Sequence, residues 1–359
     1  MRPSPPLVMG APHPYRRLPP QRFWRHAARE AAEGVPDPVT PPDFRIGPDD
    51  AVATAGSCFA QHIAAHLKAG GFNLLVTETD AGAVEAPFSA LYGNVYTARQ
   101  MLQLARRAHG LWRPGEQAWR RPDGRWVDPF RPQLFPAGFE TPEAVASARL
   151  SHLAAVERLL AEARVLVLTL GLTEAWLAPC GAALPVPPGV LGIEEGAGEA
   201  RFHNFTFEEV VADLDALMEE LLEDNPGLRV ILTVSPVPLV ATYEARHVLE
   251  SNTLSKAVLR AAAGRAADRH AAVTYFPSFE MVTSPLAPAD AFAADRRSVS
   301  DAMVGRVMGV FSRHFLAERG SLPNAPAAPS AAPDITPEQE AAFRARSSIL
   351  CDEERLDPS

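Results

Sequence analysis

Short apolar runs alternate with amphipathic stretches through the middle of the chain. After the first run, Phe59, Ile63 and Leu67 recur at the spacing of a helix face. Buried strands that alternate with helices are typical of a parallel sheet covered on both faces. The pattern predicts an α/β fold, a three-layer αβα sandwich around a five-stranded parallel sheet in flavodoxin-like order. The five predicted strands, each bounded by Gly, Pro or polar residues, are residues 51–55, 72–77, 165–170, 230–234 and 273–276.

Both ends of the chain differ in composition from the middle. Residues 1–42 hold many prolines, which fix φ and remove backbone donors, so this arm should be extended apart from a short helix over residues 22–33. Prolines and alanines dominate again in residues 320–359, a predicted disordered or loosely helical tail with a helical piece near residues 337–348. Residues 43–319 are left as a single domain.

Two long irregular segments interrupt this domain. Residues 110–138 are rich in Trp and Pro, and residues 180–198 are rich in Pro and Gly. Such segments inside a compact domain usually carry function or act as lids. In open parallel sheets the ligand crevice lies beyond the carboxyl ends of the strands, where these loops begin. We therefore expect a lid-like insertion at residues 110–138.

Charge and cysteine content narrow the classes of function. The chain carries 34 basic and 43 acidic residues, a formal charge of -9, whereas nucleic-acid binding demands clustered Lys and Arg. Three cysteines are too few and too irregularly spaced for a disulfide framework or a zinc site, which favours a cytoplasmic location. No apolar stretch approaches the ~20 residues that span a bilayer. Neither a nucleic-acid partner nor membrane insertion is expected.

No cofactor is predicted either. Neither a Gly-x-Gly-x-x-Gly nor a Walker pattern follows a predicted strand. The ten histidines are dispersed rather than clustered, so no metal site is expected.

The candidate chemistry begins at the turn after the first predicted strand. Ser57 follows Gly56 there, at the expected amino terminus of a helix, where unpaired backbone amides favour negative charge. A serine in this position is a candidate nucleophile whose own amide helps to bind an oxyanion, provided that a base is within reach. It is equally a good helix N-cap. The rival nucleophile, Cys58, is expected to point into the packing between helix and sheet.

The turn Gly56-Ser-Cys-Phe-Ala60 resembles the signature of the GSCFA family, a branch of the SGNH-hydrolase superfamily. The resemblance covers about residues 14–316 and includes part of the amino-terminal arm, so we expect that arm to dock on the domain. Further segments agree in order: Phe88-Ser-Ala-Leu-Tyr-Gly-Asn94, Asp128-Pro-Phe-Arg-Pro132, Thr169-Leu-Gly-Leu-Thr-Glu-Ala-Trp176, Thr233-Val-Ser-Pro-Val-Pro238 and Tyr275-Phe-Pro-Ser-Phe279.

The resemblance implies an SGNH-like site, in which a serine attacks an ester and a Gly and an Asn from later loops bind the oxyanion. Ser57 matches the nucleophile. Gly93 matches the second oxyanion donor, with Asn94 beside it as a possible side-chain donor. The third element, Gly-x-Asn-Asp, reads Gly171-Leu-Thr-Glu here, so Thr173 replaces the amide and brings one donor hydrogen instead of two.

The largest departure from the superfamily lies in its last element, where an Asp is followed about three residues later by the catalytic His. Asp295 is present, but Ser298 stands at the His position, so the ordinary triad cannot form. His203 is the first candidate for a replacement base, with His62 and His247 behind it. Glu174, a carboxylate at a strand end, is another candidate.

From the resemblance we expect four residues to lie around one pocket: Ser57, Gly93, Thr173 and Asp295. We interpret the chain as an ester hydrolase or O-acyltransferase acting on an acylated small molecule or carbohydrate. Tryptophans such as Trp112, Trp119, Trp126 and Trp176 fit sugar stacking, although packing in the core or the lid is the commoner role for Trp. The alternative is a non-catalytic binding protein that kept the scaffold and lost the triad His.

Overall fold

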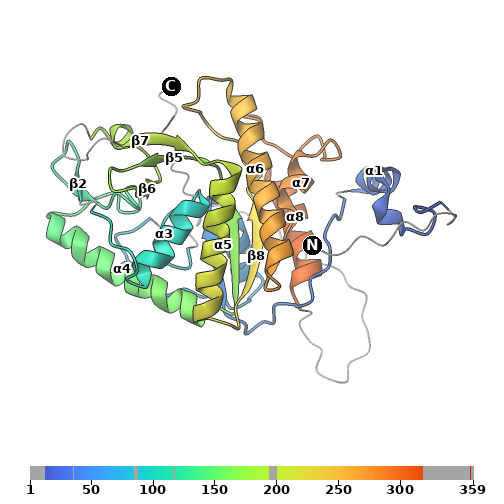
Figure 1. Ribbon diagram of the computed structural model, residues 1–359, viewed down its shortest axis with the longest axis horizontal. Coiled ribbons are helices and arrows are strands. Elements are labelled where there is room, and N and C mark those ends of the chain that lie inside the picture. Colours follow the sequence, from blue (N-terminus) through green and yellow to red (C-terminus); the bar gives the residue numbers. More distant parts are fainter. Residues whose placement is uncertain are drawn as a thin grey trace.

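A four-stranded parallel sheet forms the centre of the computed structural model (Figure 1). The strand order is β1-β4-β8-β9, and every neighbouring pair is parallel. The strands are β1 (Val52–Gly56), β4 (Val165–Leu170), β8 (Arg229–Val234) and β9 (Val273–Tyr275). The structure describes residues 13–34, 36–84, 88–115, 118–193 and 200–317, together with residue 356.

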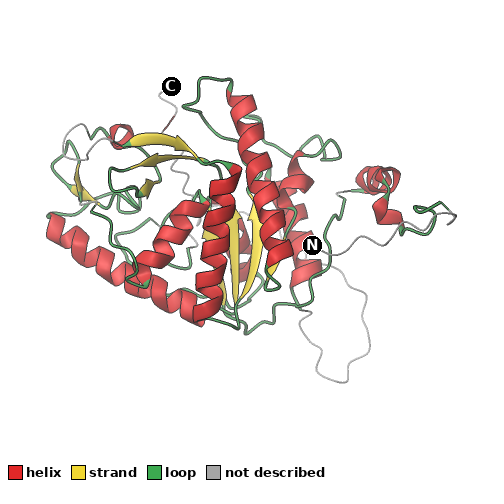
Figure 2. Ribbon diagram, viewed as in Figure 1, coloured by secondary structure: helices red, strands yellow, loops and turns green. Residues whose placement is uncertain are grey.

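Helices cover both faces of this sheet (Figure 2), as the apolar pattern predicts. The first face carries α3 (Ala98–Ala108), α4 (Pro142–Glu162), α5 (Phe207–Asp224) and α6 (Val248–Arg269). The opposite face carries α2 (Cys58–Ala69), α7 (Ser278–Thr283) and α8 (Asp301–Phe315).

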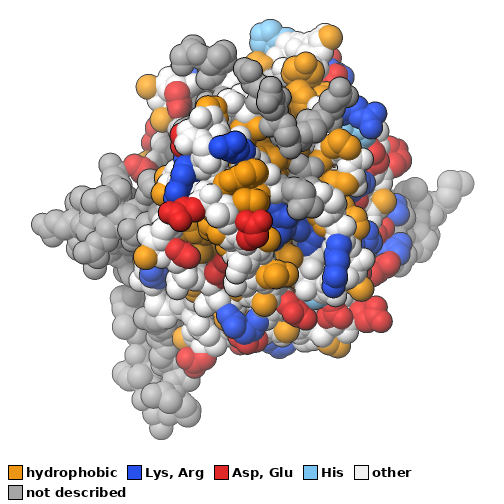
Figure 3. All heavy atoms as spheres, turned by 90° about the vertical axis from the view of Figure 1, so that its left-hand side faces the viewer, with side chains coloured by type: hydrophobic (Ala, Val, Ile, Leu, Met, Phe, Trp, Pro, Cys, Tyr) orange, Lys and Arg blue, Asp and Glu red, His pale blue; other side chains and the backbone are white. Residues whose placement is uncertain are grey.

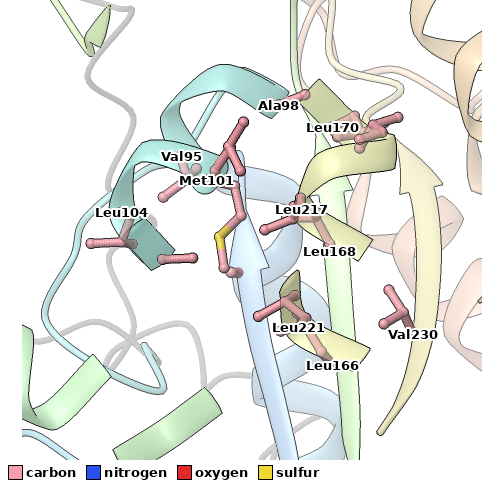
Figure 4. Close-up of a cluster of buried hydrophobic side chains, with 14 of the residues drawn as sticks. Val95, Ala98, Met101, Leu104, Leu166, Leu168, Leu170, Leu217, Leu221 and Val230 are labelled. Atoms are coloured by element: carbon pink, nitrogen blue, oxygen red, sulfur yellow. The ribbon is translucent and has the colours of Figure 1, made fainter. Parts of the chain in front are cut away.

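Alternating side chains of β4 divide between the two layers, as the period of two in a strand requires. Leu166 and Leu168 enter the layer of α3 and α5, where they lie with Leu217 and Leu221 (Figure 4). Val167, between the two leucines, packs on the opposite face among residues of α2 and α8. Continuous apolar burial of the strand therefore reflects two cores, one on each face.

The prediction of a strand at residues 72–77 is wrong, so the main sheet has four strands instead of five. This segment makes a single parallel bridge, Val52 to Leu74, on the side of β1 away from β4. Asn73 and Leu75 both bond Val52, but farther along Val76 is 46% exposed and Thr77 donates its amide to Ser89. The segment lies where the edge strand of a flavodoxin-like order would lie, without extending the ladder.

Short strands outside the main sheet build a second region, seen beside α4 in Figure 1. An antiparallel sheet joins β5 (Glu174–Leu177), β6 (Ala183–Leu184) and β7 (Arg201–Asn204), and a hairpin joins β2 (Trp119–Arg120) to β3 (Trp126–Val127). A short 3-10 helix, η2 (Pro188–Leu191), lies between β6 and β7. Trp119 is almost fully buried in an apolar cluster that includes Val127 and Leu184. The irregular segments of the sequence therefore pack on each other, and the tryptophan serves that packing.

The outer face of this second region mixes charges of both signs with apolar side chains (Figure 3). None of the described helices is long and apolar enough to cross a membrane.

The described part of the amino-terminal arm includes the 3-10 helix η1 (Pro20–Arg22), which is followed by α1 (Trp24–Glu33). Neither helix contains a buried residue, and α1 stands away from the other helices in Figure 1. The helix is therefore present nearly as predicted, but α1 itself does not dock. The arm contacts the domain farther along, where Val39 packs in the cluster of α2 and α8 and Asp37 bonds Arg313 and His314. The predicted helical piece near residues 337–348 lies outside the described residues.

Candidate active site

The turn from β1 into α2 is shaped by Gly56. Its φ is 129°, and a Cβ at this position would lie 2.2 Å from the carbonyl oxygen of Thr169. No side chain fits so close to a backbone atom, so the turn requires glycine. The next amide, that of Ser57, donates to the same Thr169 oxygen over 3.1 Å. The end of β1 and the end of β4 are thereby fastened together at the serine.

Ser57 is the N-cap residue of α2, but its side chain makes no capping hydrogen bond. The residue is 3% exposed, and its Oγ has no hydrogen-bond partner among the described residues. Serine is a favoured N-cap because its oxygen accepts a hydrogen bond from a first-turn amide. Capping therefore accounts for a serine at the start of a helix, but not for the absence of that hydrogen bond at Ser57. A buried hydroxyl that satisfies nothing is unusual, and such groups often have a chemical role.

The backbone amide of Ser57 does not match the expectation from the sequence. We expected it to help bind an oxyanion, yet it bonds Thr169. Any oxyanion donor must therefore come from another segment in this conformation.

Gly171 lies directly against the serine. A Cβ at Gly171 would be 3.1 Å from Ser57 Cβ and 3.1 Å from the carbonyl oxygen of Tyr96, which already accepts the Gly171 amide. The carbonyl oxygen of Gly171 accepts from Lys256 Nζ over 2.6 Å. Lys256 is 2% exposed, so a buried lysine is hydrogen-bonded to the residue that packs against the serine.

The candidate oxyanion segment runs beside Gly56. Val95 donates its amide to the Gly56 carbonyl oxygen over 2.8 Å. Asn94, one residue earlier, is buried, and its Oδ1 accepts from Nε2 of Gln61 in the second turn of α2 over 3.2 Å. Gly93 has a φ of 70°, which places this segment in a tight bend. The structure therefore brings the predicted oxyanion residues close to the turn that holds Ser57.

Thr173 belongs to a polar chain that joins it to β7 and to the loop before α6. Its Oγ1 donates to Asn204 Oδ1 over 2.7 Å, and Asn204 Nδ2 donates to Glu244 over 2.9 Å. The Thr173 amide donates to Ser255 Oγ over 3.0 Å. The Thr173 hydroxyl thus has its one hydrogen engaged by Asn204 of β7.

Glu174 and His203, the candidate bases, also bond neighbouring groups. Glu174 accepts from Thr242 Oγ1 over 2.6 Å and from the amide of Tyr243. Burial raises the pKa of Glu174 above its usual value although both bonds act to lower it. His203 Nε2 lies 2.9 Å from Glu209, a residue of the α5 capping box. These bonds hold both candidates within the region around β5 and β7.

The remaining candidate histidines serve local structure. His247 is the N-cap of α6, and its Nδ1 accepts from the amide of Leu249. His62 lies on α2 with its ring against Phe59. Burial lowers the pKa of His62 to about 4, although the nearby Asp301 carboxylate acts to raise it.

Asp295 and Ser298 form a self-contained turn before α8. Asp295 Oδ2 accepts from Ser298 Oγ over 2.6 Å, and Oδ1 accepts from the amides of Arg297 and Ser298. The hydrogen bond from Ser298 is the main reason why the pKa of Asp295 is lowered. Both residues are exposed. The hydroxyl at the expected His position therefore bonds the Asp that would have oriented the imidazole.

Lys256 and Gln61 are site residues that the sequence analysis missed. The signal for Lys256 was available, because it lies on the α6 face that also carries Leu259 and Ala263, both buried. A lysine on the buried stripe of a helix needs a partner inside the protein. Its partner, the Gly171 carbonyl, was not readable from the sequence.

Fold and site together define an α/β protein with a buried serine at the first strand-to-helix turn of a parallel sheet. A model described as the GSCFA family matches residues 51–311, most of the chain, and the protein belongs to that family. A search of curated proteins finds no match. Among solved structures, a carbohydrate esterase family 3 protein from Talaromyces cellulolyticus is similar over 74% of this chain and 95% of its own, with 12% identity and a TM-score of 0.28.

Proposed function

We propose that this protein is a serine-dependent ester hydrolase or O-acyltransferase acting on an acylated small molecule or carbohydrate. The observation that carries the proposal is the Oγ of Ser57, which is buried at the start of α2 without a hydrogen bond to any described residue. Membership of the GSCFA family supports it, because the family's signature is this turn.

The proposed reaction has two steps. Ser57 Oγ attacks the acyl carbonyl carbon while a base removes the hydroxyl proton, and the alcohol leaves with a proton to give an acyl-serine. Water then releases the acid in a hydrolase, or a second alcohol takes the acyl group in a transferase. Gly93 and Asn94 are the proposed donors to the oxyanion of the tetrahedral intermediate.

For the base we propose Glu174 or His203. Glu174 is supported by its raised pKa, which brings the carboxylate closer to the basicity that general-base catalysis at neutral pH requires. Either residue must exchange its present partner for substrate or Ser57. Replacing the working base with Ala should lower the esterase rate by about 10²–10⁴-fold with the fold intact. Glu219→Ala, on the exposed side of α5, is the matched control and should leave the rate unchanged.

A fluorophosphonate probe tests the nucleophile. Wild-type protein should form one adduct at Ser57, found by mass spectrometry, and Ser57→Ala should abolish it because only an activated serine reacts at a useful rate. Ser300→Ala is the matched control, since Ser300 also begins a helix but caps it. This variant should be labelled as fast as the wild type.

A non-catalytic binding function is the second candidate, and the Asp295–Ser298 turn favours it. A hydroxyl titrates far above neutral pH and cannot serve as the base. Hydrolysis of p-nitrophenyl acetate that is unchanged in Ser57→Ala, together with no labelling of the wild type, would leave this candidate. Under the catalytic proposal, Ser298→His should raise activity, because Asp295 then stands three residues from an imidazole.

A further inference from the structure

A small cavity lies between α3 and the segments around Asn94 and Phe130. Its volume is about 30 Å³, and a water molecule needs roughly 10–15 Å³ by the same measure. The space is therefore large enough for two waters or for one small polyatomic ion. Its walls combine apolar side chains with the polar or charged groups of Gln100, Arg107, Arg131 and His152.

Arg107 is the unusual member of this wall. It is 7% exposed, and its Nη2 atom has no hydrogen-bond partner in the described part of the chain. The guanidinium stacks on the Phe130 ring with its central carbon 3.6 Å from the ring centre. Burial lowers the pKa of Arg107 to about 10, so the group is still a cation at neutral pH. A buried cation with an unused donor is costly unless an acceptor is supplied.

The nearby carboxylates are bonded to other groups. Asp128 accepts from Arg131 over 3.2 Å through one oxygen and from Arg149 over 2.8 Å through the other. Glu78 lies 2.6 Å from His152 Nδ1 and also accepts from Arg131. Among the described residues, neither carboxylate forms a hydrogen bond with Arg107. An acceptor for Arg107 Nη2 therefore has to come from outside the described residues.

We propose that this cavity binds a small anionic group the size of a carboxylate, held by Arg107. A guanidinium pairs well with planar oxyanions, and a formate-sized group matches the volume. The group would also lie beside Asn94, which borders the cavity and is bonded to Gln61 of α2. The cavity would bind the anion whether or not Ser57 is a nucleophile.

Thermal unfolding at constant ionic strength tests this site with sodium formate as the probe. A ligand that binds only the folded state raises Tm in a saturable way, by about 4 °C or more at a hundredfold excess over Kd in a domain of this size. Arg107→Gln should abolish the shift, because the amide is neutral. Arg106→Gln is the matched control, since its guanidinium pairs with Glu220 outside the cavity, and this variant should shift like the wild type.

The source of the anionic group is distinguished by a second probe. Succinate that raises Tm as formate does would identify the group as the end of a larger carboxylic acid, whereas a shift with formate alone would identify a free small anion. Both results support the site.

If Arg107→Gln does not fold, wild-type crystals soaked in bromide replace that variant. Anomalous density next to Arg107 is then the expected result. Absence of bromide from the cavity, no saturable shift with formate, or an equal shift in Arg107→Gln would overturn the proposal.

Discussion

Helices α2 and α8 pack on the same face of the sheet and each begins at a serine, but the two serines behave differently. Ser300 accepts the amide of Met303 over 3.1 Å and so caps α8 in the ordinary way. Ser57 makes no such bond although it is more deeply buried. The comparison teaches that α2 begins where β1 and β4 meet, with a hydroxyl that is not used to stabilise its helix.

Alanine substitutions of one glycine at each helix, Gly56 before α2 and Gly305 within α8, should give the largest difference in the free energy of unfolding. Gly56→Ala should destabilise the protein by more than about 4 kcal/mol, because the new Cβ would lie 2.2 Å from a backbone oxygen in a left-handed conformation. Gly305→Ala, inside α8 with open space around its Cβ, should stabilise it by about 0.5–1 kcal/mol. Urea unfolding measures both. Similar stabilities of the two variants would show that the β1–α2 turn is not tightly fixed.

The interface of the two helices should give a pH effect of intermediate size. His62 has a folded-state pKa of about 4, below its ordinary value of 6.5, because burial disfavours the imidazolium. The folded state therefore keeps the neutral ring, and stability that is complete above pH 6.5 falls as the pH drops toward 4. The loss is about 2–3 kcal/mol by linkage.

Free energies of unfolding at pH 7 and pH 4.5 check this effect. His62→Gln should lose less stability than the wild type over that interval, since it cannot gain the proton. His13→Gln, in the exposed arm, is the control and should follow the wild type. Parallel curves for all three proteins would contradict the assignment to His62.

The serines themselves give the smallest effect. Ser300→Ala should lower stability by about 1 kcal/mol, the usual loss for a capping residue. Ser57→Ala should change it by less than about 0.5 kcal/mol, because no hydrogen bond is broken. Differential scanning calorimetry resolves this difference as a shift in Tm. A loss of about 1 kcal/mol in Ser57→Ala would mean that the hydroxyl does stabilise the helix.

The main sheet could be predicted from the sequence because its strands are short, mostly apolar runs. Residues 165–170 were predicted with the bounds that β4 has, since this strand is buried on both faces. Residues 72–77 failed for the opposite reason. Their apolar run resembles a strand, but at the edge it meets a partner only through Val52, and nothing in the local sequence reports that. A run of apolar residues thus indicates that a segment is buried more directly than it indicates that the segment pairs with a neighbouring strand.

The site was readable only in part. The glycine and serine of the first turn are local, so Gly56 and Ser57 could be found from the pattern of strand, glycine and helix start. The contacts that define their surroundings are long-range, such as Lys256 with Gly171, 85 positions apart in the sequence. The short strands β5 and β7 were missed for a similar reason, because they are paired across a long loop and held by ring contacts such as Trp176 with Phe202.

The bond between the Ser57 amide and Thr169 also constrains how the protein folds. One end of this contact directly follows β1 and the other lies in β4, and the chain between them includes α2, α3, α4 and the β2–β3 hairpin. Closing a loop of that length must precede the contact, and such non-local pairings slow folding. During synthesis the serine cannot adopt its native geometry until residue 169 has left the ribosome. A nascent chain that ends before β4 therefore contains the GSCFA turn, but the hydrogen bond that fixes Ser57 in its native position cannot yet form.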